Sequence, residues 1–126
     1  MALVHGNALS ERVIGLAIEV YRELGPGLLE SAYEECLCFE LLCSGMRIAR
    51  QVPLPIVYKA TTLDCGYRLD LVVEDAIVVE IKSVDRHVAI HEAQLLTYLR
   101  LSLHKIGLLM NFNAIRLKDG LRRFVL

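Results

Sequence analysis

An excess of charge of one sign is what this sequence most clearly lacks. The chain holds 14 Lys and Arg against 15 Asp and Glu, which gives a formal net charge of −1. A protein that binds nucleic acid over its whole surface carries a broad excess of basic residues. The near-equal numbers of basic and acidic residues exclude that class of protein. Only 23% of the residues are charged and 55% are apolar, so the composition also excludes a disordered chain.

Long apolar runs are missing as well. Charged residues interrupt every hydrophobic stretch before it reaches the roughly 18 residues of a membrane span. The first residues lack the basic flank and apolar run of a signal peptide, and the 126 residues contain no repeat or linker. We therefore expect a single domain over residues 1–126, a cytoplasmic location and no contact with a membrane.

The four cysteines lack the spacing of a zinc site. Cys36, Cys38, Cys43 and Cys65 include no C-x-x-C pair, and no H-E-x-x-H motif accompanies them. Free cysteine behaves as a small hydrophobic residue. The pattern favours unpaired thiols over a structural metal site.

Hydrophobic periodicity divides the chain into helices and strands. The expected helices cover residues 9–24, 28–45 and 88–103, and the expected strands cover 48–58, 67–73, 77–82, 105–113 and 122–126. The run at 77–82 is almost continuously apolar, as in a strand buried on both faces. This order, ααβββαββ, predicts an α/β fold with a mixed β-sheet flanked by helices.

Several local signals refine these boundaries. Gly25-Pro26-Gly27 is expected to end the first helix, and Pro53 and Pro55 place residues 48–58 at a sheet edge. Lys118-Asp119-Gly120 is typical of a hairpin turn. Ser31 and Glu34 have capping-box spacing, which would leave Glu30 just outside the first turn of the second helix.

Three ionisable residues interrupt the apolar strands: Asp70, Glu80 and Lys82. Burying such groups singly costs several kcal/mol, so they require partners or a cleft. A three-residue loop at 74–76 would place Asp70 opposite Glu80 and Lys82 opposite Arg68, on one face of the sheet. A two-residue loop would shift the register and separate the two carboxylates.

Two adjacent carboxylates repel each other unless a cation lies between them. Mg²⁺ suits this arrangement because it binds through one or two carboxylates together with waters and substrate phosphate. A lysine two residues along the strand would orient water or neutralise phosphate charge. The alternative is a structural ion network of the two acids with Lys82 and Arg68, and spacing alone leaves both open.

Longer motifs carry a resemblance to a known family. Gly27-Leu28-Leu29-Glu30-Ser31-Ala32-Tyr33 resembles the signature of the GxxExxY protein family, and Asp70 with Glu80-Ile81-Lys82 resembles the motif of the PD-(D/E)xK nuclease superfamily. Further similar blocks lie at 19–27, 93–99 and 107–112, in collinear order over nearly the whole chain. Leu69 precedes Asp70 where the superfamily motif has proline, at a position that does not bind metal.

The resemblance implies a restriction-endonuclease-like core and a Mg²⁺-dependent nuclease that hydrolyses phosphodiester bonds in DNA or RNA, with Mn²⁺ as another usable ion. It makes Asp70 and Glu80 metal ligands, Lys82 the catalytic lysine and Glu30 an additional catalytic acid. The remaining residues that it places at the site, as substrate-binding or supporting groups, are Gln94, Tyr98 and Tyr33.

Other interpretations of the same residues stay open. Glu30 could be a first-turn acid that the helix dipole favours, and Tyr33 could be a core aromatic. Gln94 and Tyr98 could belong to an ordinary solvated helix face. The same fold also serves as a non-catalytic module that binds nucleic acid or protein. The high apolar content predicts in addition a homodimer through an apolar face.

Overall fold

The computed structural model describes residues 2–86 and 89–126. Its helices are α1 (Ala2–Leu24), α2 (Glu30–Cys43) and α3 (Ala89–Ser102), with a short 3₁₀ helix η1 (Leu117–Gly120). The strands are β1 (Ile48–Pro53), β2 (Ile56–Tyr58), β3 (Thr61–Leu63), β4 (Arg68–Val73), β5 (Ile77–Lys82), β6 (Ile106–Asn111) and β7 (Leu121–Val125).

Five strands form a mixed sheet in the order β1-β4-β5-β6-β7. Among the described strands β5 and β6 run parallel, and the other pairs are antiparallel. The parallel pair requires a crossover, which α3 supplies. The predicted α/β fold with a mixed sheet flanked by helices is confirmed.

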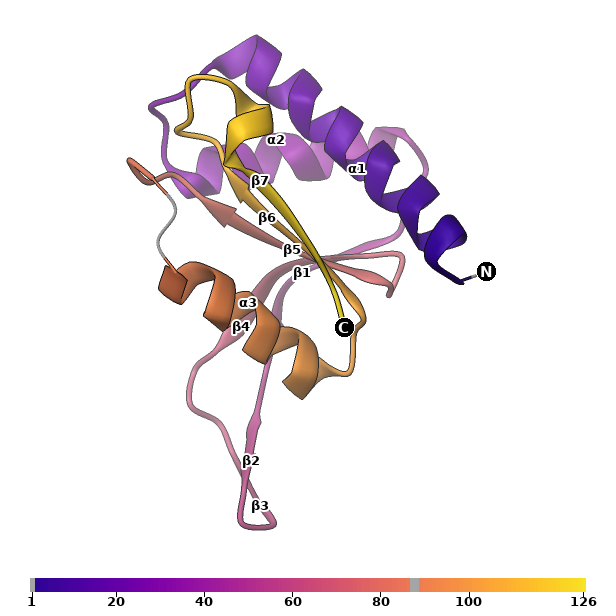
Figure 1. Ribbon diagram of the computed structural model, residues 1–126, viewed down its shortest axis with the longest axis vertical. Coiled ribbons are helices and arrows are strands. Elements are labelled where there is room, and N and C mark those ends of the chain that lie inside the picture. Colours follow the sequence, from indigo (N-terminus) through magenta and orange to yellow (C-terminus); the bar gives the residue numbers. More distant parts are fainter. Residues whose placement is uncertain (1, 87–88) are drawn as a thin grey trace.

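Helices cover both faces of the sheet (Figure 1). On one face, α1 and α2 pack through residues such as Val13 and Leu37 against Leu71 and Val79. On the other face, α3 packs through Leu95 and similar residues against the opposite sides of β4, β5 and β6. The central strand β5 is therefore buried on both faces, as its apolar run predicts. No helix in the described part of the chain is long and apolar enough to span a membrane.

The helix boundaries follow the local signals. Helix α1 ends at Leu24, and Gly25 adopts a left-handed φ of +67° that glycine tolerates without strain. The helix extends further toward the N-terminus than the predicted 9–24. Helix α3 matches the predicted 88–103 to within one residue at its C-terminal end, and residue 88 lies outside the described residues.

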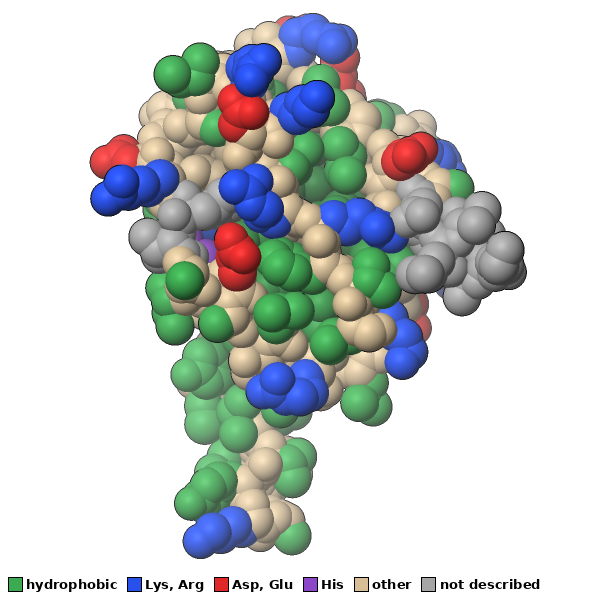
Figure 2. Space-filling view, viewed as in Figure 1, with side chains coloured by type: hydrophobic (Ala, Val, Ile, Leu, Met, Phe, Trp, Pro, Cys, Tyr) green, Lys and Arg blue, Asp and Glu red, His purple; other side chains and the backbone are tan. Residues whose placement is uncertain are grey.

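The predicted single strand over residues 48–58 is wrong. Strand β1 ends at Pro53 on the sheet edge, and β2 leaves the sheet to pair with β3 as a separate hairpin. This arm projects away from the body, and hydrophobic side chains cover much of it (Figures 1 and 2). The sequence did not predict this arm, because the apolar pattern around Val57 is equally typical of a separate hairpin strand and of a longer β1.

The connection before β7 also differs from the prediction. Residues 117–120 form η1 where the sequence indicated a hairpin turn at Lys118-Asp119-Gly120. A nine-residue connection therefore separates β6 from β7, although the two strands still pair as neighbours. Leu117 lies buried in the core, which favours a helical turn over an open one.

Candidate functional site

The loop between β4 and β5 has the predicted length. Val73 pairs with Ile77 across residues 74–76, and the antiparallel ladder continues to Leu71 and Val79. Glu74 and Asp75 adopt left-handed φ values of +53° and +49° within this turn. The register that brings Asp70 toward Glu80 is therefore established by the turn.

Beyond the pair Leu71 and Val79, the backbone N–H groups of β4 and β5 donate to carboxylates of the opposite strand instead of to backbone carbonyls. The Asp70 N–H donates to Glu80 Oε2 at 2.8 Å, and the Ile81 N–H donates to Asp70 Oδ2 at 2.8 Å. Each side chain thus accepts a hydrogen bond from the opposite strand. This exchange holds Asp70 and Glu80 side by side and leaves one oxygen of each carboxylate, Asp70 Oδ1 and Glu80 Oε1, without a hydrogen bond from any described residue.

The strict alternation of side chains along β4 breaks at Asp70. Leu69 packs in the cluster on the α3 side together with Val72, whereas Leu71 packs on the side of α1 and α2. In a regular strand Leu69 and Leu71 would share a face. The common face predicted for Asp70, Glu80 and Lys82 from a period of two is therefore interrupted at Asp70, which instead lines a pocket beside α2.

Strand β1 is irregular at the same level. Arg50 pairs with Leu71 and Val52 with Leu69, but Gln51, which lies between them, is not paired with Asp70. Gln51 has a left-handed φ of +50°, a strained conformation for a residue with a side chain. Its Nε2 donates to Glu34 Oε1 at 2.9 Å, so the distortion turns its amide into the pocket beside Asp70.

The strain at Gln51 predicts an unusual order of stabilities. Glycine within a strand normally costs about 0.5–1 kcal/mol relative to alanine. Both Gln51→Gly and Gln51→Ala lose the amide, but only glycine relieves the positive φ, so we expect Gln51→Gly to be more stable than Gln51→Ala by about 1 kcal/mol. Urea unfolding of the two variants measures this order, and the usual order of alanine above glycine would contradict it.

A second residue of β1, Arg50, also binds the Glu34 carboxylate. Glu34 is only 8% exposed, and Arg50 donates to its Oε2 from Nη2 at 2.9 Å and from Nε at 3.2 Å. Arg50 Nη2 also reaches Glu35 Oε1 at 2.8 Å. The predicted capping box of Ser31 and Glu34 is wrong, because helix α2 begins at Glu30 with no side-chain cap and Glu34 serves this network instead.

Glu30 occupies the first turn of α2 and contacts the chain directly after β5. Its Oε2 accepts a hydrogen bond from the Ser83 N–H at 3.2 Å, and Ser83 Oγ donates to the Leu28 carbonyl at 2.6 Å. A pocket of about 420 Å³ opens beside these contacts. The residues that line it are Glu30, Ser31, Glu34, Gln51, Asp70 and Ile81.

Tyr33 fixes the loop that leads into α2. Its buried hydroxyl donates to the Gly25 carbonyl at 2.6 Å and accepts from the Leu28 N–H at 3.1 Å. Its ring stacks on Phe112 with centroids 4.4 Å apart. Tyr33 is therefore both a core aromatic and a support for the loop before Glu30.

Replacing Tyr33 with phenylalanine tests this support. The variant keeps the stacked ring but leaves the Gly25 carbonyl and the Leu28 N–H without their partner, so we expect a loss of roughly 1–3 kcal/mol in unfolding free energy. Thermal or urea denaturation measures the loss. An unchanged stability would show that the hydroxyl contributes nothing to the loop.

Burial and like charge set the electrostatics of the two central carboxyls. Glu80 is only 4% exposed, and burial followed by the charge of Asp70 raises its pKa to about 8. Burial raises the pKa of Asp70 as well, partly offset by the Ile81 hydrogen bond. The positive charge of Lys82 lowers the pKa of both groups, so its ammonium lies within electrostatic reach of each.

The structural ion network considered from the sequence does not form. Among the described residues, neither Asp70 nor Glu80 has an ion pair with Lys82 or Arg68. Arg68 is exposed and donates to the Tyr67 carbonyl. The Asp70 and Glu80 carboxyls therefore lie at this end of the sheet without an ion pair to any described residue.

Gln94 and Tyr98 lie on the α3 side of the sheet. Gln94 Nε2 and the Tyr98 hydroxyl are 3.0 Å apart, and the Tyr98 ring meets Tyr67 edge to face at 6.0 Å. Burial, and next the charge of Glu80, raise the pKa of Tyr98. These two residues border a separate pocket of about 290 Å³, so the structure brings Tyr98 within electrostatic reach of Glu80 but not into the pocket of Glu30 and Asp70.

A complete set of metal-binding side chains is not preformed. Within residues 2–86 and 89–126, no three His, Cys, Asp or Glu side chains are grouped so as to hold a metal ion. Mg²⁺ usually retains several waters and needs only one or two carboxylates with substrate phosphate. The hard oxygen donors of Asp70 and Glu80, one oxygen of each still without a hydrogen bond, fit that requirement.

Sequence reasoning missed the residues that support this site. Glu34 lies four residues after Glu30, and this spacing places both residues on one helix face. The spacing could therefore have identified Glu34 as a neighbour of Glu30 at the site. Asn111 is buried and accepts from the Val84 N–H at 3.1 Å while donating to the Val84 carbonyl at 2.9 Å, which fixes the chain beyond Lys82. The tertiary roles of Arg50, Gln51 and Ser83 have no comparable local signature.

Comparison with known proteins agrees with this geometry. The family profile described as the PD-(D/E)XK nuclease superfamily matches residues 7–124. Searches of curated proteins and of solved structures returned no match. The match includes both helices that precede the sheet, the Asp70 and Glu80 strands, and the strands after α3. The chain belongs to the PD-(D/E)XK nuclease superfamily.

Proposed function

We propose that this protein is a divalent-metal-dependent nuclease that hydrolyses phosphodiester bonds in DNA or RNA, and that it belongs within the superfamily to the GxxExxY group. One observation carries the proposal most strongly. Asp70 and Glu80 come from separate strands and meet at the end of an interrupted ladder, with the charge of Lys82 acting on both. This arrangement of two acids and one lysine supports metal-assisted hydrolysis.

Asp70 and Glu80 would hold the ion through the oxygens that the backbone does not use. Mg²⁺, or Mn²⁺ in its place, would polarise the scissile phosphate and lower the pKa of an attacking water. The ion would also relieve the repulsion between the two buried carboxyls. A bound ion would therefore make the adjacency of the two acids favourable.

The surrounding residues have distinct proposed roles. Lys82 would neutralise charge that develops on the phosphate and orient the attacking water. Glu30, held by the Ser83 N–H at 3.2 Å, would act as the additional acid at the rim of the Asp70 pocket. Tyr33 would keep the loop before Glu30 in place through its hydrogen bonds to Gly25 and Leu28.

Gln94 and Tyr98 are proposed to support substrate from the α3 side. Their side chains contact each other and border the second pocket, close enough for Glu80 to influence the Tyr98 pKa. A strand of nucleic acid that reaches the Asp70 pocket would then contact α3 with its flanking nucleotides. Homodimer formation and a cytoplasmic location stay predictions from the composition.

Incubation of the purified protein with single- and double-stranded DNA and RNA tests the proposed activity. We expect cleavage of at least one form with Mg²⁺ or Mn²⁺ and none with EDTA. Isothermal calorimetry with each ion, without nucleic acid, provides an independent measurement. Absence of both cleavage and metal binding would favour the alternative, a non-catalytic module that binds nucleic acid or protein.

A further inference from the structure

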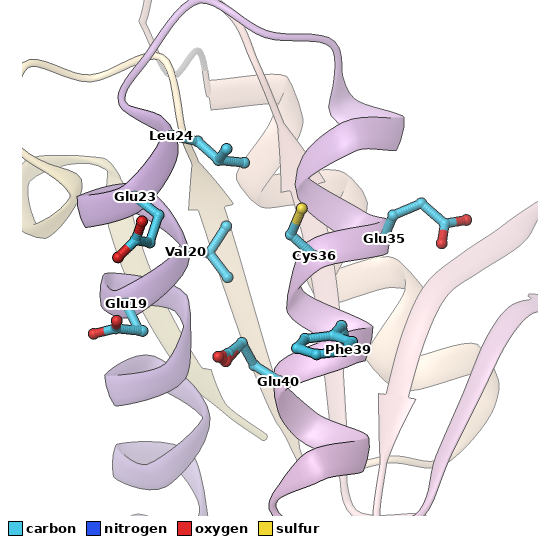
Figure 3. Close-up of a pocket in the computed structure, with 8 residues that line it drawn as sticks. All are labelled: Glu19, Val20, Glu23, Leu24, Glu35, Cys36, Phe39 and Glu40. Carbon is cyan, nitrogen blue, oxygen red and sulfur yellow. The ribbon is translucent and has the colours of Figure 1, made fainter.

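A further pocket of about 420 Å³ lies between α1 and α2, on the outer side of both helices. Its floor is apolar and consists of Val20 and Leu24 from α1 with Cys36 and Phe39 from α2. In Figure 3, Val20 and Leu24 point from α1 toward α2, and Cys36 points back toward α1. We refer to this pocket as the α1–α2 groove.

Apolar surface continues from the groove along α2. Phe39 is 65% exposed and Leu42, one turn further, is 60% exposed. Each large apolar side chain that is removed from water gains about 1.5–3 kcal/mol. The groove and these two side chains together therefore form a surface that gains free energy when another chain covers it.

Four glutamates also line the groove, although the Glu35 side chain points away from α1 in Figure 3. Glu19 and Glu23 come from α1, and Glu35 and Glu40 come from α2. Glu19 pairs with Arg22 and Glu35 with Arg50. The carboxylates of Glu23 and Glu40 have no hydrogen bond or ion pair with the described residues, and Figure 3 shows Glu40 extending toward α1.

The unpaired carboxylates of Glu23 and Glu40 narrow the range of occupants. Nucleic acid and the anionic surface of a membrane would place like charges against these two carboxylates. A second copy placed face to face would oppose glutamate to glutamate. The described helices of this chain offer no alternative, because α2 has no Lys or Arg, α3 has only Arg100, and α1 has Arg12 and Arg22 among several acids.

We propose that the α1–α2 groove binds a basic amphipathic helix from a different protein. Two packed helices with an apolar trough between them suit a third helix laid along the trough. The groove residues extend over about two turns of each helix, so the ligand would contribute apolar residues at positions i, i+3 or i+4, and i+7. Lys or Arg on both flanks of that stripe would meet Glu23 and Glu40.

The groove is separate from the candidate nuclease site. Helix α2 directs Tyr33 and Glu34 inward, toward the core and the Asp70 pocket, while Cys36 and Phe39 face the groove. A bound helix would therefore leave the Asp70 pocket open. The inference depends on no catalytic property of the protein, and its test gives the same answer whether or not the protein cleaves nucleic acid.

A synthetic peptide provides the probe. An 18-residue helix with a leucine stripe flanked by Lys and Arg is titrated into the full chain, and a peptide of the same composition in scrambled order is the control. Cys36 lines the groove, whereas Cys65 is exposed at the base of the β2–β3 arm. We expect the helical peptide, and not the scrambled one, to slow iodoacetamide alkylation at Cys36 at least fivefold while Cys65 stays unchanged.

Charge reversal tests the role of Glu23 and Glu40. The double variant Glu23→Lys/Glu40→Lys should bind the basic peptide at least tenfold more weakly by fluorescence anisotropy, and it should bind a peptide with Glu in place of Lys and Arg more tightly than wild type does. Phe39→Ala should weaken both kinds of binding. The exposed substitution Leu103→Ala, directly after α3 on the opposite face of the sheet, is the matched control.

Several results would overturn the proposal. Equal binding of the helical and scrambled peptides, or binding that survives both charge reversal and Phe39→Ala, would show that the groove is not a specific site. Self-association by analytical ultracentrifugation that Phe39→Ala abolishes would identify a second copy as the occupant. Peptide binding that protects Cys65 and not Cys36 would place the contact elsewhere.

Discussion

Asp70→Asn is expected to abolish metal-dependent cleavage of nucleic acid, with a loss on the order of 10²–10⁴-fold. The substitution keeps the shape of the side chain and the hydrogen bond from Ile81 but removes the charge that would hold the ion. Lys82→Ala should lose activity on a similar scale, while Lys82→Arg should retain part of it because the charge remains. Initial rates at saturating Mg²⁺ measure these losses.

Folding and activity can be separated in this experiment. Asp70 is a partly buried acid and burial raises its pKa, so removal of its charge removes a desolvation cost and should leave the protein at least as stable as wild type. Asp119→Asn, an exposed substitution in η1, is the matched control and should keep full activity. Activity of Asp70→Asn equal to that of the control would refute the assigned role of Asp70.

Glu80→Gln is expected to stabilise the metal-free protein at alkaline pH while it removes activity. Burial and the charge of Asp70 raise the pKa of Glu80 to about 8, against an ordinary value of 4.5. Ionised Glu80 therefore costs the wild-type fold on the order of 5 kcal/mol at pH 9. Glutamine avoids this cost, and its side-chain carbonyl still accepts the hydrogen bond from Asp70.

The direction of the pH dependence follows from proton binding. Between pH 4.5 and 8 the folded state holds the Glu80 proton and the unfolded state has released it, so the unfolding free energy of wild type should fall as pH rises through this range. The raised pKa of Asp70 acts in the same direction. Glu35 and Glu74, whose pKa values are lowered, act with the opposite sign below pH 4.5.

Urea unfolding in EDTA at several values of pH measures this effect. Wild type should lose stability from pH 5 to pH 9, and Glu80→Gln should lose much less. Added Mg²⁺ should restore wild type at pH 9 but not the variant, because ligand binding to the folded state is stabilising. Glu11→Gln removes an exposed carboxylate and should behave as wild type; a flat profile for wild type would contradict the prediction.

Much of the fold was predictable because its signals are local. Apolar periodicity indicated three helices, and the glycine after α1 marked its end. The three-residue loop at 74–76 fixed the β4–β5 register, which in turn brought Asp70 and Glu80 together. The acidic pair and lysine could be identified because charged residues are costly in an otherwise apolar strand.

Other parts of the site depend on contacts between distant segments. The local sequence predicts that Glu34 caps its own helix. Only the packing of β1 against α2 shows that Arg50 and Gln51 donate hydrogen bonds to its carboxylate instead. Ser83 reads as the end of a strand, and only the packing of α2 places it against Glu30. The β2–β3 arm resembles a continuation of β1, since a hairpin and an extended strand have the same local pattern.

The sequence by itself determined the composition class, the order of the three helices and of the five sheet strands, and the presence of Asp70, Glu80 and Lys82 on two neighbouring strands. Each of these depends on propensity or periodicity within a short segment. The tertiary structure alone decided the burial of Glu80, the strained backbone of Gln51 opposite Asp70, and the acidic α1–α2 groove. These features arise from the way separate layers pack, and that packing sets solvent exclusion and charge proximity, which no single segment contains.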